Sequence, residues 1–210
     1  MTELKTPHQA RNAGRNRRLV PVLAVTLAAL VALVALMTAD QRVASPEAVA
    51  YAYMEARADL DVGATQALFA ADATLDDSGY DLSEMPALYD WYRASNWTST
   101  RGVCTEAPSG EGGTLVRCSN EFENDWSRAL GDSPIGADIQ VLVSNGEIVS
   151  LTSFYGDEFG GLWDAFFTFV DNNHPDDVDL MYGAAGPLLD DESIALWEQH
   201  TRDFVASLGG

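Results

Sequence analysis

The hydrophobic pattern of the chain begins with its most apolar stretch. Residues 19–37, LVPVLAVTLAALVALVALM, contain no charged side chain. At about 1.5 Å per residue, a helix of this length comes close to the roughly 30 Å hydrocarbon core of a bilayer. The stretch therefore predicts a transmembrane helix. The alternatives are a buried core helix and a cleaved signal peptide, whose apolar core is normally shorter, about 7–15 residues.

After a short linker, 38–44, the pattern becomes that of a globular domain. Ser45 directly precedes PEAVAYAYMEARADL, which begins with Pro46. The apolar spacing of this segment predicts a helix capped by Ser45. A second, short helix is predicted in GATQALFAADA, and a third in DLSEMPALYDWYRASN, where Pro86 delays the start. Alternating segments follow in TSTRGVCTEA, TLVRCSNEFEN and IGADIQVLVSNGEIVSLTSFY. The Asn145-Gly146 pair in the last of these is a strong hairpin signal, so the middle predicts an antiparallel sheet of at least four strands.

The last third of the chain again has helical spacing. Apolar residues recur every three or four positions in DESIALWEQHTRDFVASLGG. Two aromatic and apolar segments between residues 158 and 183 precede it. Both faces of the predicted Asn-Gly hairpin are apolar, which suggests that both are covered. We therefore expect residues 158–210 to be a helical extension that packs on a face of the 45–157 domain and leaves that domain monomeric.

Charge is divided unevenly along the chain. The net charge is -20, yet the first eighteen residues are basic. By the positive-inside rule, residues 1–18 form a cytosolic tail and the acidic body lies outside a single-pass cell membrane anchor, so that the bilayer is one expected partner. A body this acidic excludes nucleic acid as a partner.

The two cysteines flank a turn-rich stretch, PSGEGG. Glu111, in the middle of this turn, is also the midpoint of positions 104 and 118. A hairpin folded there places Cys104 opposite Cys118, with Cα atoms about 4.5–5.5 Å apart. In an exported protein such a pair predicts a disulfide, and the alternative is a functional thiol pair. No Cys-x-x-Cys motif supports metal or redox chemistry at these thiols.

The strand that follows Cys118 indicates where a pocket could lie. Its alternation places Val116, Asn120, Phe122 and Asn124 on the face of Cys118 and mostly charged residues on the other. The predicted pocket residues are Trp97, Asn120, Phe122, Asn124, Trp126 and Tyr155. The alternatives are that the amides satisfy backbone groups and that the aromatic rings are core.

Residues suited to catalysis are scarce on that face. Glu121 and Glu123 are out of phase with it, and His174 and His200 accompany helical segments. We predict no catalytic residue, no metal ligand and no cofactor.

The segment SPEAVAYAYMEARADLDVGATQALFAADA resembles the opening of SnoaL-like domains in the nuclear-transport-factor-2-like superfamily. The resemblance covers residues 45–157. It implies an α+β fold in which helices close over a curved antiparallel sheet, forming a cone with a pocket. The superfamily includes isomerases, cyclases, hydrolases and proteins without catalytic activity, so the fold does not fix the function.

These expectations favour a membrane-anchored extracytoplasmic module that binds a small apolar ligand or an envelope protein without catalysis. The alternative is a lyase, isomerase or hydrolase acting on a small apolar substrate in the cone.

Overall fold

The computed structural model describes residues 44–75, 80–109, 112–183 and 186–209. The predicted basic tail and the predicted membrane segment, residues 19–37, lie outside these ranges. Among the helices within them, none has both the length and the apolar character needed to cross a membrane.

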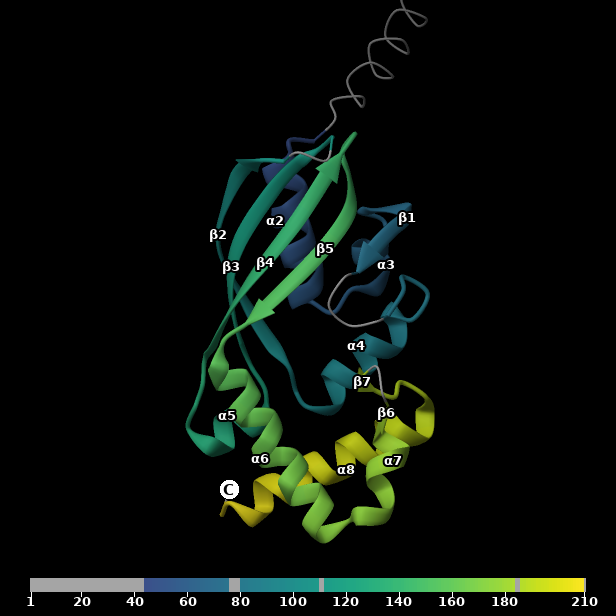
Figure 1. Cartoon of the computed structure of the whole chain (residues 1–210), viewed down its shortest axis with the longest axis vertical. Helices are drawn as coiled ribbons and strands as arrows, with labels where there is room; N and C mark the ends of the chain where they lie inside the picture. The colour runs from purple at the N-terminus through teal and green to yellow at the C-terminus, as the bar shows by residue number, and fades with distance from the viewer. Residues whose placement is uncertain (1–43, 76–79, 110–111, 184–185, 210) are drawn as a thin grey trace, which may run out of the picture. The chain divides into compact units, whose positions relative to one another are not determined.

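A curved five-stranded sheet forms one wall of the body (Figure 1). The strand order is β1-β5-β4-β3-β2, and the four strands from β2 to β5 pair antiparallel, as predicted. The fifth strand, β1, pairs parallel with β5 at one edge. The strands are β1 (Phe69–Leu75), β2 (Thr98–Pro108), β3 (Thr114–Glu123), β4 (Ile135–Ser144) and β5 (Glu147–Tyr155).

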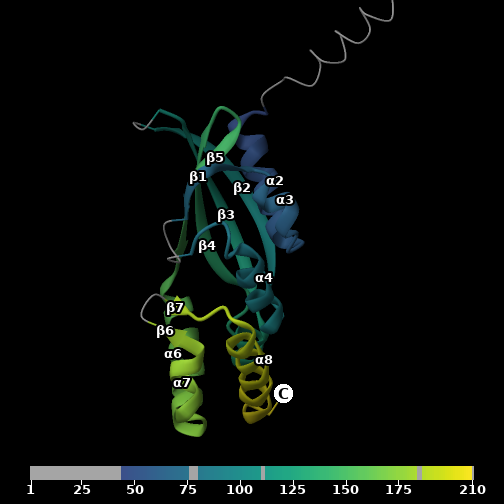
Figure 2. The same cartoon turned by 90° about the vertical axis from the view of Figure 1, so that its right-hand side faces the viewer.

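One helix, α2, packs along the inner face of this sheet, and two more, α3 and α4, follow it in the chain (Figure 2). The first, α2 (Pro46–Ala58), begins where predicted, because the Ser45 hydroxyl accepts a hydrogen bond from the Ala48 amide at 3.2 Å. The second, α3 (Val62–Gln66), is short, and the third, α4 (Met85–Ala94), carries the expected proline in its first turn. The body is therefore an α+β fold with helices packed on a curved, mostly antiparallel sheet.

One predicted helix is partly a strand. The segment GATQALFAADA was expected to be helical throughout, but its helix ends at Gln66 and β1 begins at Phe69. Alanine favours a helix locally. The residues instead pair with β5, where Phe69 lies opposite Ile148 and Leu75 opposite Leu151. A partner far along the chain thus overrides the local preference.

The hairpin formed by β2 and β3 has the predicted register. Cys104 lies directly opposite Cys118, the two are joined by a disulfide, and their Cα atoms are 4.0 Å apart, slightly closer than expected. A bulge between Arg101 and Cys104 precedes the pair. Gly102 lies in this bulge, where a Cβ atom would be 2.1 Å from the Ser119 hydroxyl, so only glycine fits without displacement.

The β4–β5 hairpin turns at Asn145 and Gly146, whose φ angles are 54° and 87°, in agreement with the predicted turn. Its pairing shifts between Leu142 and Val143. Beyond this bulge the side chains of β5 change face, and Tyr155 shares the inner face with Ala137. Phe154 on the opposite face is 49% exposed, although both faces of this hairpin were expected to be covered.

The C-terminal helices lie beyond the end of the sheet. The longest of them, α6 and α8, pack against each other, and α8 also packs on α4 and α5 (Figures 1 and 2). The elements are α5 (Asp125–Leu130), α6 (Asp157–Asn173), the 3₁₀ helix η1 (Pro175–Asp177), α7 (Val178–Met181), β6 (Tyr182–Gly183), β7 (Gly186–Pro187) and α8 (Asp191–Ser207).

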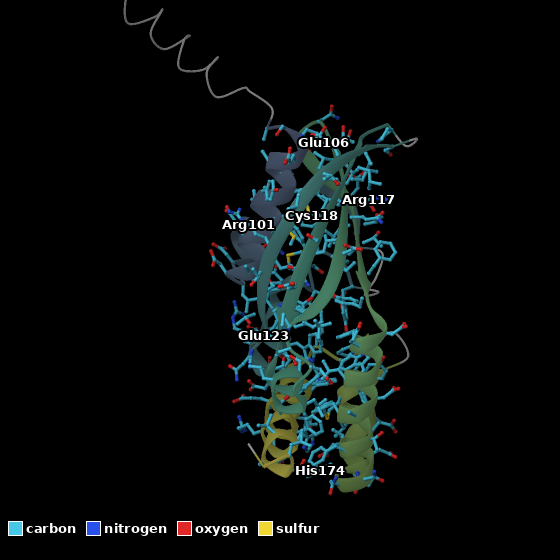
Figure 3. All side chains as sticks on the ribbon, turned by 90° about the vertical axis from the view of Figure 1, so that its left-hand side faces the viewer. Arg101, Glu106, Arg117, Cys118, Glu123 and His174 are labelled. Atoms are coloured by element: carbon cyan, nitrogen blue, oxygen red, sulfur yellow. A yellow bond between two sulfur atoms is a disulfide. The ribbon has the colours of Figure 1, made fainter. Side chains whose placement is uncertain are left out.

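These helices contact the 45–157 domain through α4 and α5 at the end of the sheet, and they do not lie over its outer face. On that face Arg117, Ser119 and Glu121 are exposed, and Figure 3 shows Arg117 projecting from it. Polar side chains there need no cover, whereas the apolar rings of α5, α6 and α8 bury one another. The monomeric state stays a prediction, and it now rests on the polarity of this face.

Candidate ligand-binding cavity

A cavity of about 220 Å³ lies between α2, α4, β5 and the segment that begins at α6. Its lining is mostly aromatic and apolar, which is typical of sites for small molecules. The lining residues are Tyr53, Arg57, Leu75, Tyr80, Met85, Leu88, Tyr89, Trp91, Tyr92, Trp97, Leu151, Ser153, Tyr155, Phe159, Trp163, Tyr182, Gly186 and Pro187.

A single arginine on α2 contributes the only charge among the described residues of this lining. Val49, Tyr53 and Arg57 follow one another at intervals of four, so they share the buried face of the helix. Arg57 is only 3% exposed, and its guanidinium carbon lies 5.5 Å and 5.7 Å from the ring centres of Trp97 and Tyr92. These cation–π contacts stabilise a charge that burial removes from water.

Three hydrogen-bond donors of the lining have no acceptor. They are Nη1 of Arg57 and the indole nitrogens of Trp91 and Trp97, and all three are buried without a hydrogen-bond partner among the described residues. Each of these groups can only donate. Buried donors normally find an acceptor, so the lining has donors available for a ligand that brings oxygen atoms.

Three phenols of the lining stay protonated. Burial raises the pKa of Tyr53 and of Tyr80 far above the ordinary value, and it raises the pKa of Tyr89 to about 12. Burial alone would lower the pKa of Arg57, but the neighbouring phenols of Tyr92 and Tyr53 hold that pKa above its ordinary value. The guanidinium therefore keeps its charge, and the phenols of Tyr53, Tyr80 and Tyr89 remain neutral at physiological pH.

The electrostatic balance inside the cavity is positive. Its lining, as far as the structure describes it, contains no aspartate, glutamate or histidine. The chain as a whole has a net charge of -20. A positive cavity inside an acidic protein favours a ligand with a negative charge.

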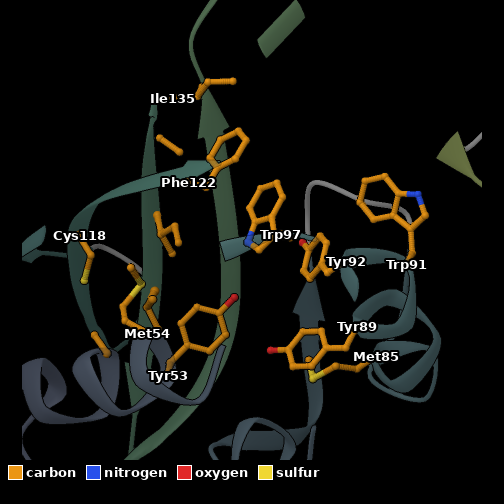
Figure 4. Close-up of a cluster of buried hydrophobic side chains, with 14 of the residues drawn as sticks. Tyr53, Met54, Met85, Tyr89, Trp91, Tyr92, Trp97, Cys118, Phe122 and Ile135 are labelled. Carbon is orange, nitrogen blue, oxygen red and sulfur yellow. The ribbon is translucent and has the colours of Figure 1, made fainter. Parts of the chain in front are cut away.

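Stacked rings make one wall of the cavity rigid (Figure 4). Trp97 lies between two rings, with ring centres 4.8 Å from Tyr92 and 4.1 Å from Phe122 and interplanar angles of 17° and 10°. On the opposite side, Tyr53 and Tyr89 point their hydroxyl groups toward the same space. The Tyr89 hydroxyl is held by Thr65 at 3.0 Å.

The small β6–β7 hairpin closes one side of the cavity. The Tyr80 hydroxyl donates a hydrogen bond to the Pro187 carbonyl at 2.6 Å, which joins the segment before α4 to β7. Gly186 has a φ of +130°, a conformation that favours glycine, and a Cβ atom there would lie 3.3 Å from the Tyr80 oxygen. This contact depends on residues more than a hundred positions apart.

The structure separates the six pocket residues predicted from the sequence. Trp97 and Tyr155 line the cavity, and Phe122 lies behind Trp97 in the stack. Asn120 is buried on the inner face of β3 but does not reach the lining. Asn124 caps α5 in a reciprocal arrangement with Ser127, which is the structural alternative stated above. Trp126 packs in the core of the C-terminal helices.

The sequence reasoning missed the residues that supply the donors, Arg57 and Trp91. Arg57 is in the last turn of α2, where a cation commonly lies exposed and interacts with the helix dipole. The available signal was its spacing of four from Tyr53 and eight from Val49, which places it on the apolar face.

Comparisons with known proteins concern about half of the chain. No family model matches it, and no curated protein matches it. Among solved structures, it is similar to a ketosteroid isomerase-like protein from Erwinia carotovora atroseptica, with 19% identity over 54% of this chain and 95% of the other, and a TM-score of 0.39. An NTF2-like protein of unknown function from Cytophaga hutchinsonii has 12% identity over 54% of this chain and 91% of the other, with a TM-score of 0.37.

The Orange Carotenoid Protein of Anabaena (Nostoc) sp. PCC 7120, a structure with bound canthaxanthin, is similar over 52% of this chain and 36% of its own. The identity is 17% and the TM-score 0.42. At these identities and TM-scores, the likenesses say nothing about what the present chain binds.

Proposed function

We propose that the body is a SnoaL-like, nuclear-transport-factor-2-like module that binds a small carboxylate with an apolar or aromatic body inside the cone. The observation that carries the proposal is the set of three buried donors, from Arg57, Trp91 and Trp97, without an acceptor among the described residues. A carboxylate supplies acceptor oxygens to the Arg57 guanidinium and neutralises its charge, since charge-assisted bonds of this kind are the strong ones. The apolar lining accommodates the rest of the ligand.

The volume of the cavity limits the size of the ligand. An engineered apolar cavity of about 150 Å³ binds benzene. The 220 Å³ available here therefore suits one ring with a short side chain that ends in the carboxylate. A larger ligand would require the Tyr80–Pro187 contact to open.

Binding without catalysis fits the chemistry of the lining better than turnover. General acid–base catalysis commonly uses a carboxylate or an imidazole with a pKa near the working pH. The described lining has neither, and burial keeps Tyr53, Tyr80 and Tyr89 protonated, so that these phenols are not available as bases. No specific observation favours the alternative of a lyase, isomerase or hydrolase.

The variant Arg57→Met tests the role of the buried guanidinium. In the full-length protein, cinnamate binding is expected to weaken at least about 30-fold, because losing the partner of a buried charge costs about 2 kcal/mol or more. The free energy of unfolding without ligand is expected to stay the same or rise, because an apolar side chain replaces a buried charge. Isothermal titration calorimetry measures binding, and quenching of tryptophan fluorescence reports on the cavity.

Two controls make this experiment specific. Arg117→Met removes an exposed arginine from the outer face of β3 and is expected to leave binding unchanged. Cinnamyl alcohol has nearly the same shape as cinnamate without the charge, and is expected to bind the wild type at least tenfold more weakly. Equal binding of the two compounds, or full cinnamate binding by Arg57→Met, contradicts the proposal.

We further propose that residues 19–37 anchor the body on the outer side of the cell membrane. The uncharged stretch and the basic residues before it support this orientation. Protease added to intact spheroplasts is expected to digest the body, and carbonate-washed membranes are expected to retain an uncut chain with its original N-terminus. A mature N-terminus after Ala39 or Ala44 would instead indicate a cleaved signal peptide.

A further inference from the structure

A second cluster of functional side chains lies at the end of the body opposite the sheet. His174 follows α6, while His200 and Asp203 lie one turn apart on α8. One ligand atom from each of these residues lies within 4.8 Å of the other two. Figure 3 shows His174 beside α6 and α8, far from the cysteine pair. None of these residues lines the cavity.

The protonation of His200 follows from its neighbours. Its ring is fully buried, and Nε2 lies 2.9 Å from a carboxylate oxygen of Asp177. Because a carboxylate accepts, the Nε2 atom carries the proton that it donates. In the neutral ring this leaves a lone pair on Nδ1.

The lone pair of His200 lacks a donor. Among the described residues Nδ1 has no hydrogen-bond partner, and it faces the Asp203 carboxylate at 3.8 Å. Nε2 of His174 lies 4.0 Å from the same carboxylate oxygen, and the two imidazole rings are 4.1 Å apart. Three possible ligand atoms thus lie around one small space, where a cation is a partner for all three.

We propose that this space is a zinc site with His174 Nε2, His200 Nδ1 and an Asp203 carboxylate oxygen as ligands. Two imidazoles and a carboxylate are a usual zinc set, and a water molecule completes the tetrahedron. Zinc bonds of about 2.1 Å place ligand atoms about 3.4 Å apart, so side-chain rotations must bring these atoms closer to one another when zinc binds. The site ties the end of α6 to α8.

The Asp177 contact supports zinc in particular. A metal-ligating histidine commonly donates its other N–H to a carboxylate, which fixes the ring and increases the basicity of the ligating nitrogen. Asp177 takes this position toward His200. The side chains of His174 and Asp203 are 29% and 46% exposed, so a metal ion can enter from solvent.

The experiment uses the full-length protein in mild detergent without a polyhistidine tag. Co²⁺ is added as a spectroscopic probe and then displaced with Zn²⁺, and bound metal is counted by plasma mass spectrometry. One equivalent of metal is expected, with the visible absorption of tetrahedral cobalt that zinc abolishes. Asp203→Asn and His174→Gln are expected to remove this absorption while circular dichroism remains unchanged.

Two further variants identify the ligands. Asp177→Asn is expected to weaken zinc binding by about 10- to 100-fold, as loss of an orienting carboxylate does. His8→Gln changes the only other histidine of the chain and is expected to have no effect. Zinc binding that persists in Asp203→Asn overturns the proposal. The proposal is also overturned if the protein takes up no metal and nitrogen NMR shows that the His200 ring is protonated on both nitrogens, because a proton then replaces the cation.

Discussion

Replacing Trp126 with alanine is expected to lower the free energy of unfolding by about 3–5 kcal/mol, the usual range for removing a large buried aromatic ring. Trp126 is 1% exposed and stacks on Phe166 with ring centres 4.1 Å apart. It also contacts Trp163 and Trp197, so its ring joins α5 to both long C-terminal helices. Urea denaturation of the full-length protein, followed by circular dichroism, measures the loss.

Two controls separate the parts of this effect. Trp126→Phe keeps a ring but removes the indole N–H that donates to the Thr201 hydroxyl at 2.9 Å, and is expected to cost about 1–3 kcal/mol. Leu208→Ala alters an exposed residue of the last turn, 45% exposed, and is expected to change stability by no more than about 0.5 kcal/mol. A Trp126→Ala protein as stable as the Leu208→Ala protein contradicts the packing described above.

The disulfide has the second large expected effect. The double variant Cys104→Ala/Cys118→Ala is expected to lose about 3 kcal/mol of stability, because the bond closes a loop with a sequence separation of 14. Alanine is the suitable replacement, since both positions are buried and a serine hydroxyl would need a partner there. The denaturation midpoint of the wild type is expected to fall toward that of the variant when dithiothreitol is added.

The redox state of the cell compartment gives a second test of the disulfide. The same chain expressed without residues 1–43 stays in the reducing cytosol, where the two thiols are expected to remain free and to react with maleimide after unfolding. Exported full-length protein is expected to react only after reduction. Midpoints that are identical with and without dithiothreitol show that the bond does not stabilise the fold.

Local patterns in the sequence predicted the parts of the fold that depend on nearby residues. The Cys104–Cys118 register follows from a turn centred between the two thiols, and the turn at Asn145 follows from the requirement for positive φ. The burial of Val116 and Phe122 follows from simple alternation along β3.

The remaining features depend on contacts between distant residues. The strand β1 forms because Phe69 meets Ile148, and no signal within its alanine-rich segment indicates that partner. The bulge near Leu142 reverses the phase of β5 and brings Tyr155 into the cavity. The packing of Trp126, Phe166 and Trp197 sets the place of the C-terminal helices. The exposed polar residues on the outer face of the sheet do not compete with this packing.

The candidate site was predicted only in part for the same reason. Trp97 and Tyr155 line the cavity, but the donors on Arg57 and Trp91 come from helices whose buried faces converge only in the folded body. A buried arginine is a rare feature, and burial is a property of the fold. The chemistry of the cavity therefore emerges from tertiary structure.

We propose that the cone holds a small carboxylate on Arg57. The most direct measurement is mass spectrometry of small molecules extracted from full-length protein purified from its own membranes, with Arg57→Met and Arg117→Met purified in parallel. One or a few aryl or short-chain carboxylates are expected to be enriched in the wild type and in Arg117→Met, and absent from Arg57→Met. Neutral molecules recovered equally from all three proteins would contradict this proposal.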